Sequence, residues 1–309
     1  MLELKDLKKV QVGGCHLNKE QVFNHAWEKG CRLFDTGFGY SGPGVNDVAI
    51  GEILSKNHKR DEFMICQKLP LYGELYKDTF GKDLRDMDDT EMENAIRKVF
   101  DIQCKRCQTE YFDIYMYHAI YDNRFRADFD LIKETQFYIR VGKVLAKLKS
   151  EGKINHIGFS SHNVFEYLYY FIEEMEKALG KTFMDVAEVA YNVLNSNGNK
   201  NTLFTDVYRI TVWDAAGEKG LEYLKSKGYF IIDMMPTESG RLFEIDTSDN
   251  WRDWNFRFIR ENKNIDIVLA GTSNIKHFDQ YWDILVDKVD LVTLPDMRII
   301  NNAHKHCHE

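Results

Sequence analysis

The sequence lacks the features that mark membrane-spanning, secreted and disulfide-stabilised proteins. Its 309 residues contain no apolar run that reaches the roughly 18 residues needed to span a bilayer. The first segment, Met1–Asp6, is too charged for a signal peptide. Six cysteines in a chain of this length are too sparse for a disulfide scaffold. We therefore expect a soluble protein of the cytoplasm.

An excess of positive charge is also missing. The chain has 41 lysines and arginines against 49 acidic residues, which gives a net charge of −8. Because nucleic acids and anionic membranes attract basic surfaces, neither is an expected partner. A hydrophobic content of 44% and a charged content of 29% are typical of a globular protein. The length accommodates one large α/β domain or two smaller ones.

What the chain does contain is an alternation of short apolar runs with amphipathic segments. The apolar runs predict eight strands, at Val10–Val12, Cys31–Phe34, Phe63–Leu69, Phe112–Tyr117, Ile154–Phe159, Val186–Val193, Tyr229–Met234 and Ile265–Ala270. The intervening segments predict helices at Asn18–Lys29, Val45–Lys56, Val164–Leu179, Asp214–Lys227, Trp251–Asn262 and Ile275–Val286. Two more helices are predicted between the third and fifth strands: one begins at Thr90, and the other ends at Gly152. Residues 70–89 are expected to be irregular, a second long insert is expected over roughly residues 120–135, and Thr90–Glu93 fits a capping box.

This alternation predicts parallel strands joined by helical crossovers, and eight such units are best closed as a (β/α)8 barrel. The alternative is a doubly wound open sheet, which usually carries a glycine-rich phosphate loop after its first strand. The stretch Val12–Cys15 does not match that fingerprint, so the barrel is favoured. No linker or change of composition divides the chain. We expect one domain over residues 1–309, with residues 296–309 as a disordered tail.

Four polar side chains fall at or just past the ends of the second, third and fourth predicted strands. They are Asp35, Tyr40, Lys68 and His118. Taken singly, each has an ordinary structural explanation as a turn cap, one tyrosine among 16, a strand-end lysine or a core histidine. In a barrel, however, these loops are neighbours on one face. Their coincidence there favours a catalytic site.

The four groups suit the reduction of a carbonyl, whose oxygen needs a proton when the carbon accepts hydride. A phenol with a pKa of ~10 is a weak acid near neutrality, but a nearby ammonium stabilises the phenolate and eases proton release. Tyr40 and Lys68 supply this pair, and Asp35 can hold the ammonium in place. His118 in its neutral form can donate a hydrogen bond that orients the carbonyl.

The sequence resembles the aldo-keto reductase family. The resemblance is collinear over nearly the whole chain and is carried by Leu33–Tyr40, Cys66–Lys68, Tyr111–His118, Glu151–His162, Val189–Asn192 and Gly271–Ser273. It implies a (β/α)8 barrel and nicotinamide-dependent reduction of an aldehyde or ketone, or the reverse reaction on a sugar-type alcohol. It also implies that Asp35, Tyr40, Lys68 and His118 form the family's tetrad. Some short stretches of the sequence are similar to the branch of the family that carries a ferredoxin-like cysteine tail. Cys307 is the only cysteine after Cys107, so no iron–sulfur cluster is expected.

The resemblance also implies which residues hold the nicotinamide end of NADP or NAD. Ser160 and Ser161 lie where the family contacts the nicotinamide amide. Glu188 takes a position that is usually glutamine, and Met234 one that often carries a ring-stacking aromatic residue. A methionine sulfur can still pack against such a ring.

At the other end of the cofactor, Gly271, Thr272 and Ser273 match the family's pyrophosphate site and lead into a helix N-terminus, a natural anion site. The family often has an arginine for the 2′-phosphate in the next stretch. Here that stretch, Asn274–Tyr281, has Lys276 instead, which lacks the bidentate fork of arginine. NADPH is favoured by resemblance, with weak discrimination against NADH.

Alternatives to the reductase remain at this stage. One is a barrel that binds a nucleotide or a partner without turnover, which the altered adenine-end stretch favours; another is a cofactor-assisted isomerase or lyase. The intact tetrad favours the enzyme. Arg124 and Arg126 in the second insert could clamp an anionic or polyhydroxyl substrate, or lie on the surface. No metal site is predicted, and neither the substrate nor the oligomeric state is specified.

Overall fold

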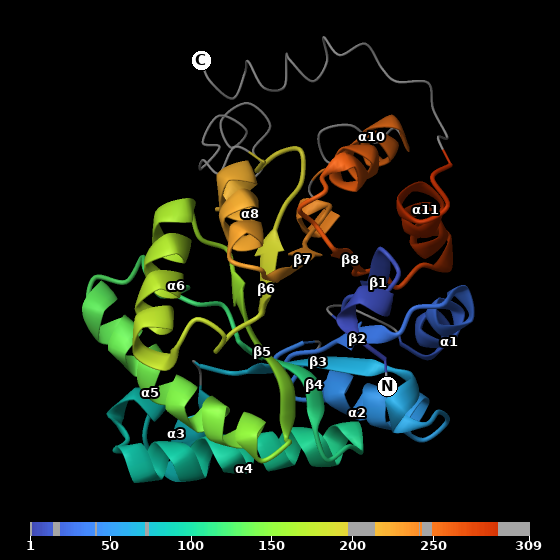
Figure 1. Ribbon diagram of the computed structural model, residues 1–309. Helices are drawn as coiled ribbons and strands as arrows, with labels where there is room; N and C mark the ends of the chain where they lie inside the picture. Colours follow the sequence, from blue (N-terminus) through green and yellow to red (C-terminus); the bar gives the residue numbers. More distant parts are fainter. Residues whose placement is uncertain are drawn as a thin grey trace.

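Eight parallel strands close into a barrel (Figure 1). The computed structural model describes residues 2–14, 19–40, 42–71, 74–196, 214–240, 242 and 249–289. Each strand pairs with the next in the sequence, and the last returns to the first. The strands are β1 (Val10–Val12), β2 (Leu33–Asp35), β3 (Met64–Leu69), β4 (Phe112–Tyr117), β5 (Ile154–Ser161), β6 (Val186–Ala190), β7 (Phe230–Met234) and β8 (Ile267–Ala270). The (β/α)8 prediction is confirmed, and the open-sheet alternative is wrong.

Helices follow the strands and surround the barrel (Figure 1). They are α1 (Lys19–Lys29), α2 (Val45–Ala49), α3 (Glu74–Phe80), α4 (Asp89–Cys107), α5 (Leu131–Ser150), α6 (Phe165–Leu179), α8 (Gly217–Ser226), α10 (Asp249–Glu261) and α11 (Ile275–Leu285). Among the described residues, no helix combines the length and apolar character that crossing a bilayer requires. The tail at 296–309 and most of the loop at 194–213 lie outside the described residues.

The strands bury side chains on both faces, as expected of a parallel barrel covered by helices. One buried cluster fills the barrel interior: Leu33, Met64, Cys66, Ile114, Met116, Val186, Ala190, Ile232, Met234, Ile267 and Leu269. Leu2, Leu4 and Leu7, which precede β1, pack against this cluster. The second, larger cluster lies between the strands and the helices. Alternate side chains of a strand point to the same face. Asp35, Lys68 and Glu188 each follow an interior residue of β2, β3 or β6 by two positions, so all three side chains point into the barrel near its C-terminal end.

Several predicted boundaries need correction. The stretch 70–89 is not irregular throughout: it contains α3 and a 3₁₀ turn, Leu84–Asp86, because Tyr76 is buried and its hydroxyl donates to the Pro70 carbonyl at 3.0 Å. The capping box lies two residues earlier than predicted. Asp88 and Glu91 each accept from the other's amide at 2.9 Å, so α4 begins at Asp89.

Three further elements differ in extent. The predicted helix Val45–Lys56 is α-helical only to Ala49 and continues as a π-helix over Ile50–Ser55. Strand β5 runs on to Ser161 because Ser160 and Ser161 pair with β6, whereas β6 itself ends at Ala190. The two serines therefore belong to a strand and not to a loop.

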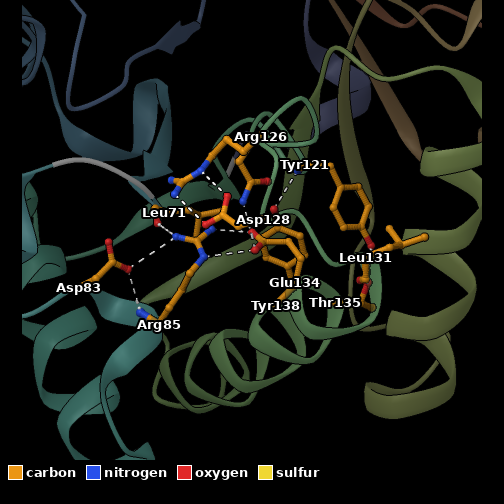
Figure 2. Close-up of polar contacts among 11 residues, drawn as sticks. Leu71, Asp83, Arg85, Tyr121, Arg126, Asp128, Leu131, Glu134, Thr135 and Tyr138 are labelled. Carbon is orange, nitrogen blue, oxygen red and sulfur yellow. Dashed lines mark hydrogen bonds and ion pairs between the residues drawn. The ribbon is translucent and has the colours of Figure 1, made fainter.

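The inserts that follow β3 and β4 are joined by an ion pair (Figure 2). Arg85 donates to Glu134 of α5 at 2.5 and 3.2 Å and to the Leu71 carbonyl at 3.1 Å. On the α5 side, the Tyr121 amide donates to the Tyr138 hydroxyl at 2.8 Å, and the Tyr121 and Thr135 hydroxyls lie 2.6 Å apart. These contacts fasten both inserts to α5.

Candidate active site

Lys68 is the centre of a buried charged cluster at the C-terminal end of the barrel. Its side chain has no exposed surface. Its Nζ forms an ion pair with Oδ1 of Asp35, the last residue of β2, and lies 3.0 Å from Oε2 of Glu188 on β6. One ligand atom each from Asp35, Glu188 and Cys66 lie within 4.8 Å of one another. The positive charge that these groups surround is the Lys68 ammonium.

The cluster changes the protonation behaviour of its members. Burial lowers the pKa of Lys68, but the Asp35 and Glu188 carboxylates outweigh that effect and raise its pKa well above the ordinary value. Lys68 is therefore a fixed ammonium. Burial also raises the pKa of Asp35 and raises that of Glu188 to about 7, although Lys68 opposes both shifts. Two carboxylates thus compete for one positive charge.

Tyr40 lies in the turn after β2, half-buried beside Lys68. The Lys68 Nζ is 5.2 Å from the centre of the Tyr40 ring. The ring also packs against Gly37: a Cβ added there would lie 3.2 Å from it, so a larger residue would crowd the phenol. Burial raises the pKa of Tyr40, Lys68 opposes that rise, and the Asp35 and Glu188 carboxylates add to it. The ammonium is thus the group that favours proton release.

His118 follows β4 and faces the same phenol. The two ring centroids are 5.7 Å apart, with the planes at 81° in an edge-on arrangement. Burial, together with the positive charge of Lys68 and the neighbouring His162, lowers the pKa of His118 to about 3. The imidazole is therefore neutral near pH 7, with one N–H able to donate. The structure brings all four predicted tetrad residues together.

Residues outside the tetrad hold the strand ends in place. Asp47 of α2 accepts from the hydroxyl of Thr36 at 2.8 Å and from the amide of Gln67 at 3.0 Å. Thr36 directly follows Asp35 in the sequence, and Gln67 directly precedes Lys68. Gln103 of α4 donates to the Lys68 carbonyl at 2.9 Å. Sequence reasoning missed Asp47 and Gln103, because their partners are distant in sequence and only the fold brings them together.

The residues predicted for the nicotinamide end lie at the same rim. Ser160 and Ser161 are buried; Ser160 Oγ accepts from the Ala119 amide at 2.8 Å, and Ser161 Oγ accepts from Asn163 at 3.0 and 3.1 Å. Asn163 Oδ1 is buried and accepts no hydrogen bond from any residue in the described part of the chain. This free acceptor, which sequence reasoning missed, lies beside the two serines. Met234, at the end of β7, is part of the interior cluster.

The predicted pyrophosphate end lies after β8. Gly271 and Ser273 are exposed, and a Cβ added at Gly271 would meet nothing within 4 Å. Asn274 caps α11 by accepting from the Lys276 amide at 2.9 Å, and the Lys276 side chain is exposed. Gly271, Thr272 and Ser273 therefore form an open rim at a helix N-terminus, with one cation in the first turn.

The sequence was compared with models of known protein families. The model of the Aldo/keto reductase family matches residues 17–263, most of the chain. The chain belongs to the aldo/keto reductase family. None of the curated proteins to which the chain was compared matches it.

Solved structures of aldo-keto reductases share the fold at low sequence identity. One from Klebsiella pneumoniae, solved in complex with NADP and acetate, has a TM-score of 0.63 at 14% identity; the match covers 97% of this chain and 92% of that one. Another, from a Medee basin deep-sea metagenome library, gives 0.61 at 16%, with coverages of 99% and 92%. A third, from Brucella melitensis, gives 0.61 at 15%, with 97% and 92%. At such identities the likeness shows the barrel and no more.

Within this aldo/keto reductase, two arginines that sequence reasoning raised as substrate clamps have protein partners. Arg124 forms a buried ion pair with Asp214 at 2.7 Å and thereby joins the loops after β4 and β6. Arg126 pairs with Asp128 at 3.0 Å on the exposed surface (Figure 2). Arg124 is therefore a structural link across the rim, and neither guanidinium is presented as an unpaired clamp.

Proposed function

We propose that this family member is a nicotinamide-dependent oxidoreductase that reduces an aldehyde or ketone, or oxidises the corresponding sugar-type alcohol. The observation that carries the proposal is the meeting of Tyr40, Lys68, Asp35 and His118 at one end of the barrel. A phenol beside a fixed ammonium and a neutral imidazole is the set of groups that protonates and orients a carbonyl oxygen. The buried, intact cluster argues against a barrel that only binds nucleotide.

Tyr40 is assigned as the general acid, which transfers its proton to the carbonyl oxygen as the alcohol forms. Lys68 stabilises the resulting phenolate, and Asp35 holds the ammonium in place through their ion pair. His118 remains neutral and donates a hydrogen bond to the same oxygen, which selects the orientation of the substrate. In the oxidative direction the roles reverse, and the Tyr40 phenolate accepts the proton.

The rim fits a nicotinamide dinucleotide, which would supply the hydride when bound. The free acceptor Asn163 Oδ1 lies beside Ser160 and Ser161, where a carboxamide N–H₂ could donate. At the other end, the rim from Gly271 to Ser273 leads to the N-terminus of α11, which favours a phosphate group. The structural neighbour from Klebsiella pneumoniae was solved with NADP, which supports this class of cofactor.

The direct test is to titrate the purified protein with NADPH and with NADH while following nicotinamide fluorescence, and then to assay a panel of aldehydes, ketones and sugars. The proposal expects binding below the millimolar range and turnover of at least one carbonyl substrate. Failure of both nucleotides to bind at millimolar concentration would contradict it and favour a non-enzymatic barrel.

Cofactor choice gives the first specific prediction. We expect NADPH to be preferred over NADH only weakly, with Lys276 supplying that preference. Because Lys276 is exposed, we expect its contact with the phosphate to lie at the low end of the ~1.5–3 kcal/mol of a charge-assisted hydrogen bond, so Lys276→Ala should weaken NADPH binding by about tenfold and leave NADH binding nearly unchanged. Dissociation constants for both nucleotides, measured in both proteins, check this.

Two further variants sharpen the result. Lys276→Arg offers a bidentate fork at the same position and should raise the NADPH preference. Lys263→Ala removes an exposed lysine that precedes β8, at the other end of the barrel, and should change neither constant. A hundredfold NADPH preference that survives Lys276→Ala would show that the 2′-phosphate is bound elsewhere.

A further inference from the structure

We propose that Glu188 is a positioning residue of this reductase: it shares the Lys68 ammonium with Asp35, and its protonation state sets how readily Tyr40 releases its proton. The inference rests on the reductase function proposed above and adds a regulator to that site. Its observable consequence is a reduction rate that falls as Glu188 ionises.

Glu188 is buried beside the Lys68 ammonium. Glu188 is 1% exposed, and its Oε2 lies 3.0 Å from the Lys68 Nζ, which also forms an ion pair with Asp35. Among the residues that the structure describes, the ionisable groups that face it are Asp35 from β2, Cys66 and Lys68 from β3, and Tyr40 from the turn after β2. Its strand neighbours across the sheet, Ser160 on β5 and Ile232 on β7, are uncharged.

The buried cluster has two carboxyl groups for one ammonium. When both carboxylates are ionised, the buried cluster of Asp35, Lys68 and Glu188 carries one positive and two negative charges. Two carboxylates this close in a buried site cannot both ionise easily, so the pair retains one proton. The raised pKa of Glu188, about 7 as a result of burial and the Asp35 charge against the pull of Lys68, agrees with this count. The cluster is thus neutral at mildly acidic pH and anionic at mildly alkaline pH.

The charge state of the cluster then acts on the phenol. With Glu188 protonated, proton transfer from Tyr40 to the carbonyl oxygen leaves a phenolate beside a neutral cluster. With Glu188 ionised, the same transfer leaves a phenolate beside a cluster that is already negative. Because like charge disfavours the phenolate, Tyr40 is the weaker acid in the second state. The proton that Glu188 loses goes to solvent, and no other group changes.

The kinetic test compares the pH dependence of carbonyl reduction in wild type and in Glu188→Gln, which keeps the shape of the side chain but cannot ionise. We expect the wild-type turnover rate to fall by about tenfold across a single ionisation near pH 7, and the variant to lose that step. Glu176→Gln is the matched control, since Glu176 pairs with Lys227 at 2.7 Å in the helix layer and should leave the profile unchanged. A wild-type step that persists in Glu188→Gln would overturn the proposal.

A second measurement needs neither cofactor nor substrate. An acid whose pKa is raised in the folded state loses stabilisation as pH rises from its ordinary pKa to the raised one. The thermal unfolding midpoint of wild type should therefore fall relative to Glu188→Gln between pH 4.5 and about 7, and the difference should then level off. Glu188→Met, also unable to ionise, is measured beside it so that a folding defect of one variant does not decide the result. A difference that is constant with pH would overturn the proposal.

The two measurements separate this inference from the function on which it rests. If neither nucleotide binds and no carbonyl substrate is turned over, the reductase assignment fails, yet the unfolding data still decide whether Glu188 holds a shared proton. If Tyr40→Phe is inactive and the Glu188→Gln profile keeps its step, the reductase stands and the role of Glu188 is overturned. A third outcome is that Glu188→Gln weakens nucleotide binding by the same factor at every pH while the fall in rate near pH 7 persists. That result would assign Glu188 to the cofactor site and would also overturn its proposed role.

Discussion

Replacing Tyr40 by phenylalanine is expected to abolish carbonyl reduction while leaving nucleotide binding nearly unchanged. The substitution removes only the phenol oxygen and its proton, and the ring keeps its packing against Gly37 and its edge-on contact with His118 at 5.7 Å. Loss of a positioned general acid costs ~10²-fold or more in turnover. Steady-state kinetics with the best substrate, together with fluorescence titration of the nucleotide, measure the two effects separately.

The control for this prediction is Tyr169→Phe. Tyr169 lies on α6 with 46% of its surface exposed, remote from the charged cluster, so its hydroxyl should not matter for turnover. Near wild-type turnover by Tyr40→Phe would show that another group protonates the carbonyl and that the tetrad is assigned wrongly. A large loss of nucleotide affinity in the same variant would instead place Tyr40 in the cofactor site.

The barrel and its charged rim could be predicted from the sequence because both follow from local patterns. Apolar runs of strand length alternate with helical spacing, and the interval between Phe112 and Tyr117 matches β4 residue for residue. Once the strands are known, their last residues must meet at one end of a closed barrel. That is why Asp35, Lys68 and His118 could be grouped from the sequence.

What could not be predicted depends on contacts between distant segments. Glu188 was expected to face the nicotinamide, and nothing in the sequence indicates that its carboxylate reaches the Lys68 ammonium from across the barrel. The buried partners Asp47 and Gln103 are also set by three-dimensional packing. The helix α3 forms in a stretch that reads as irregular, because burial of Tyr76 outweighs weak local propensity. These misses concern how the rim is supported and charged, not where it lies.

Replacing Lys68 by methionine is expected to be at least as damaging as losing the phenol, and to change the pH dependence of the residual activity. Methionine keeps an unbranched chain of similar length but removes the ammonium, which favours the Tyr40 phenolate against burial and two carboxylates. We expect a loss of ~10²-fold or more in turnover. A pH–rate profile identical to that of wild type would remove Lys68 from the mechanism.

Lys68→Met also leaves Asp35 and Glu188 buried without a counter-ion, and breaking a buried ion pair can cost ~3–5 kcal/mol of stability. A folding defect must therefore be separated from a chemical one. The double variant Lys68→Met with Glu188→Gln removes one of the two uncompensated carboxylates, so its thermal unfolding midpoint should recover part of the loss. Its turnover should not recover, because the phenol still lacks its ammonium. Recovery of both together would show that Lys68 acts through stability alone.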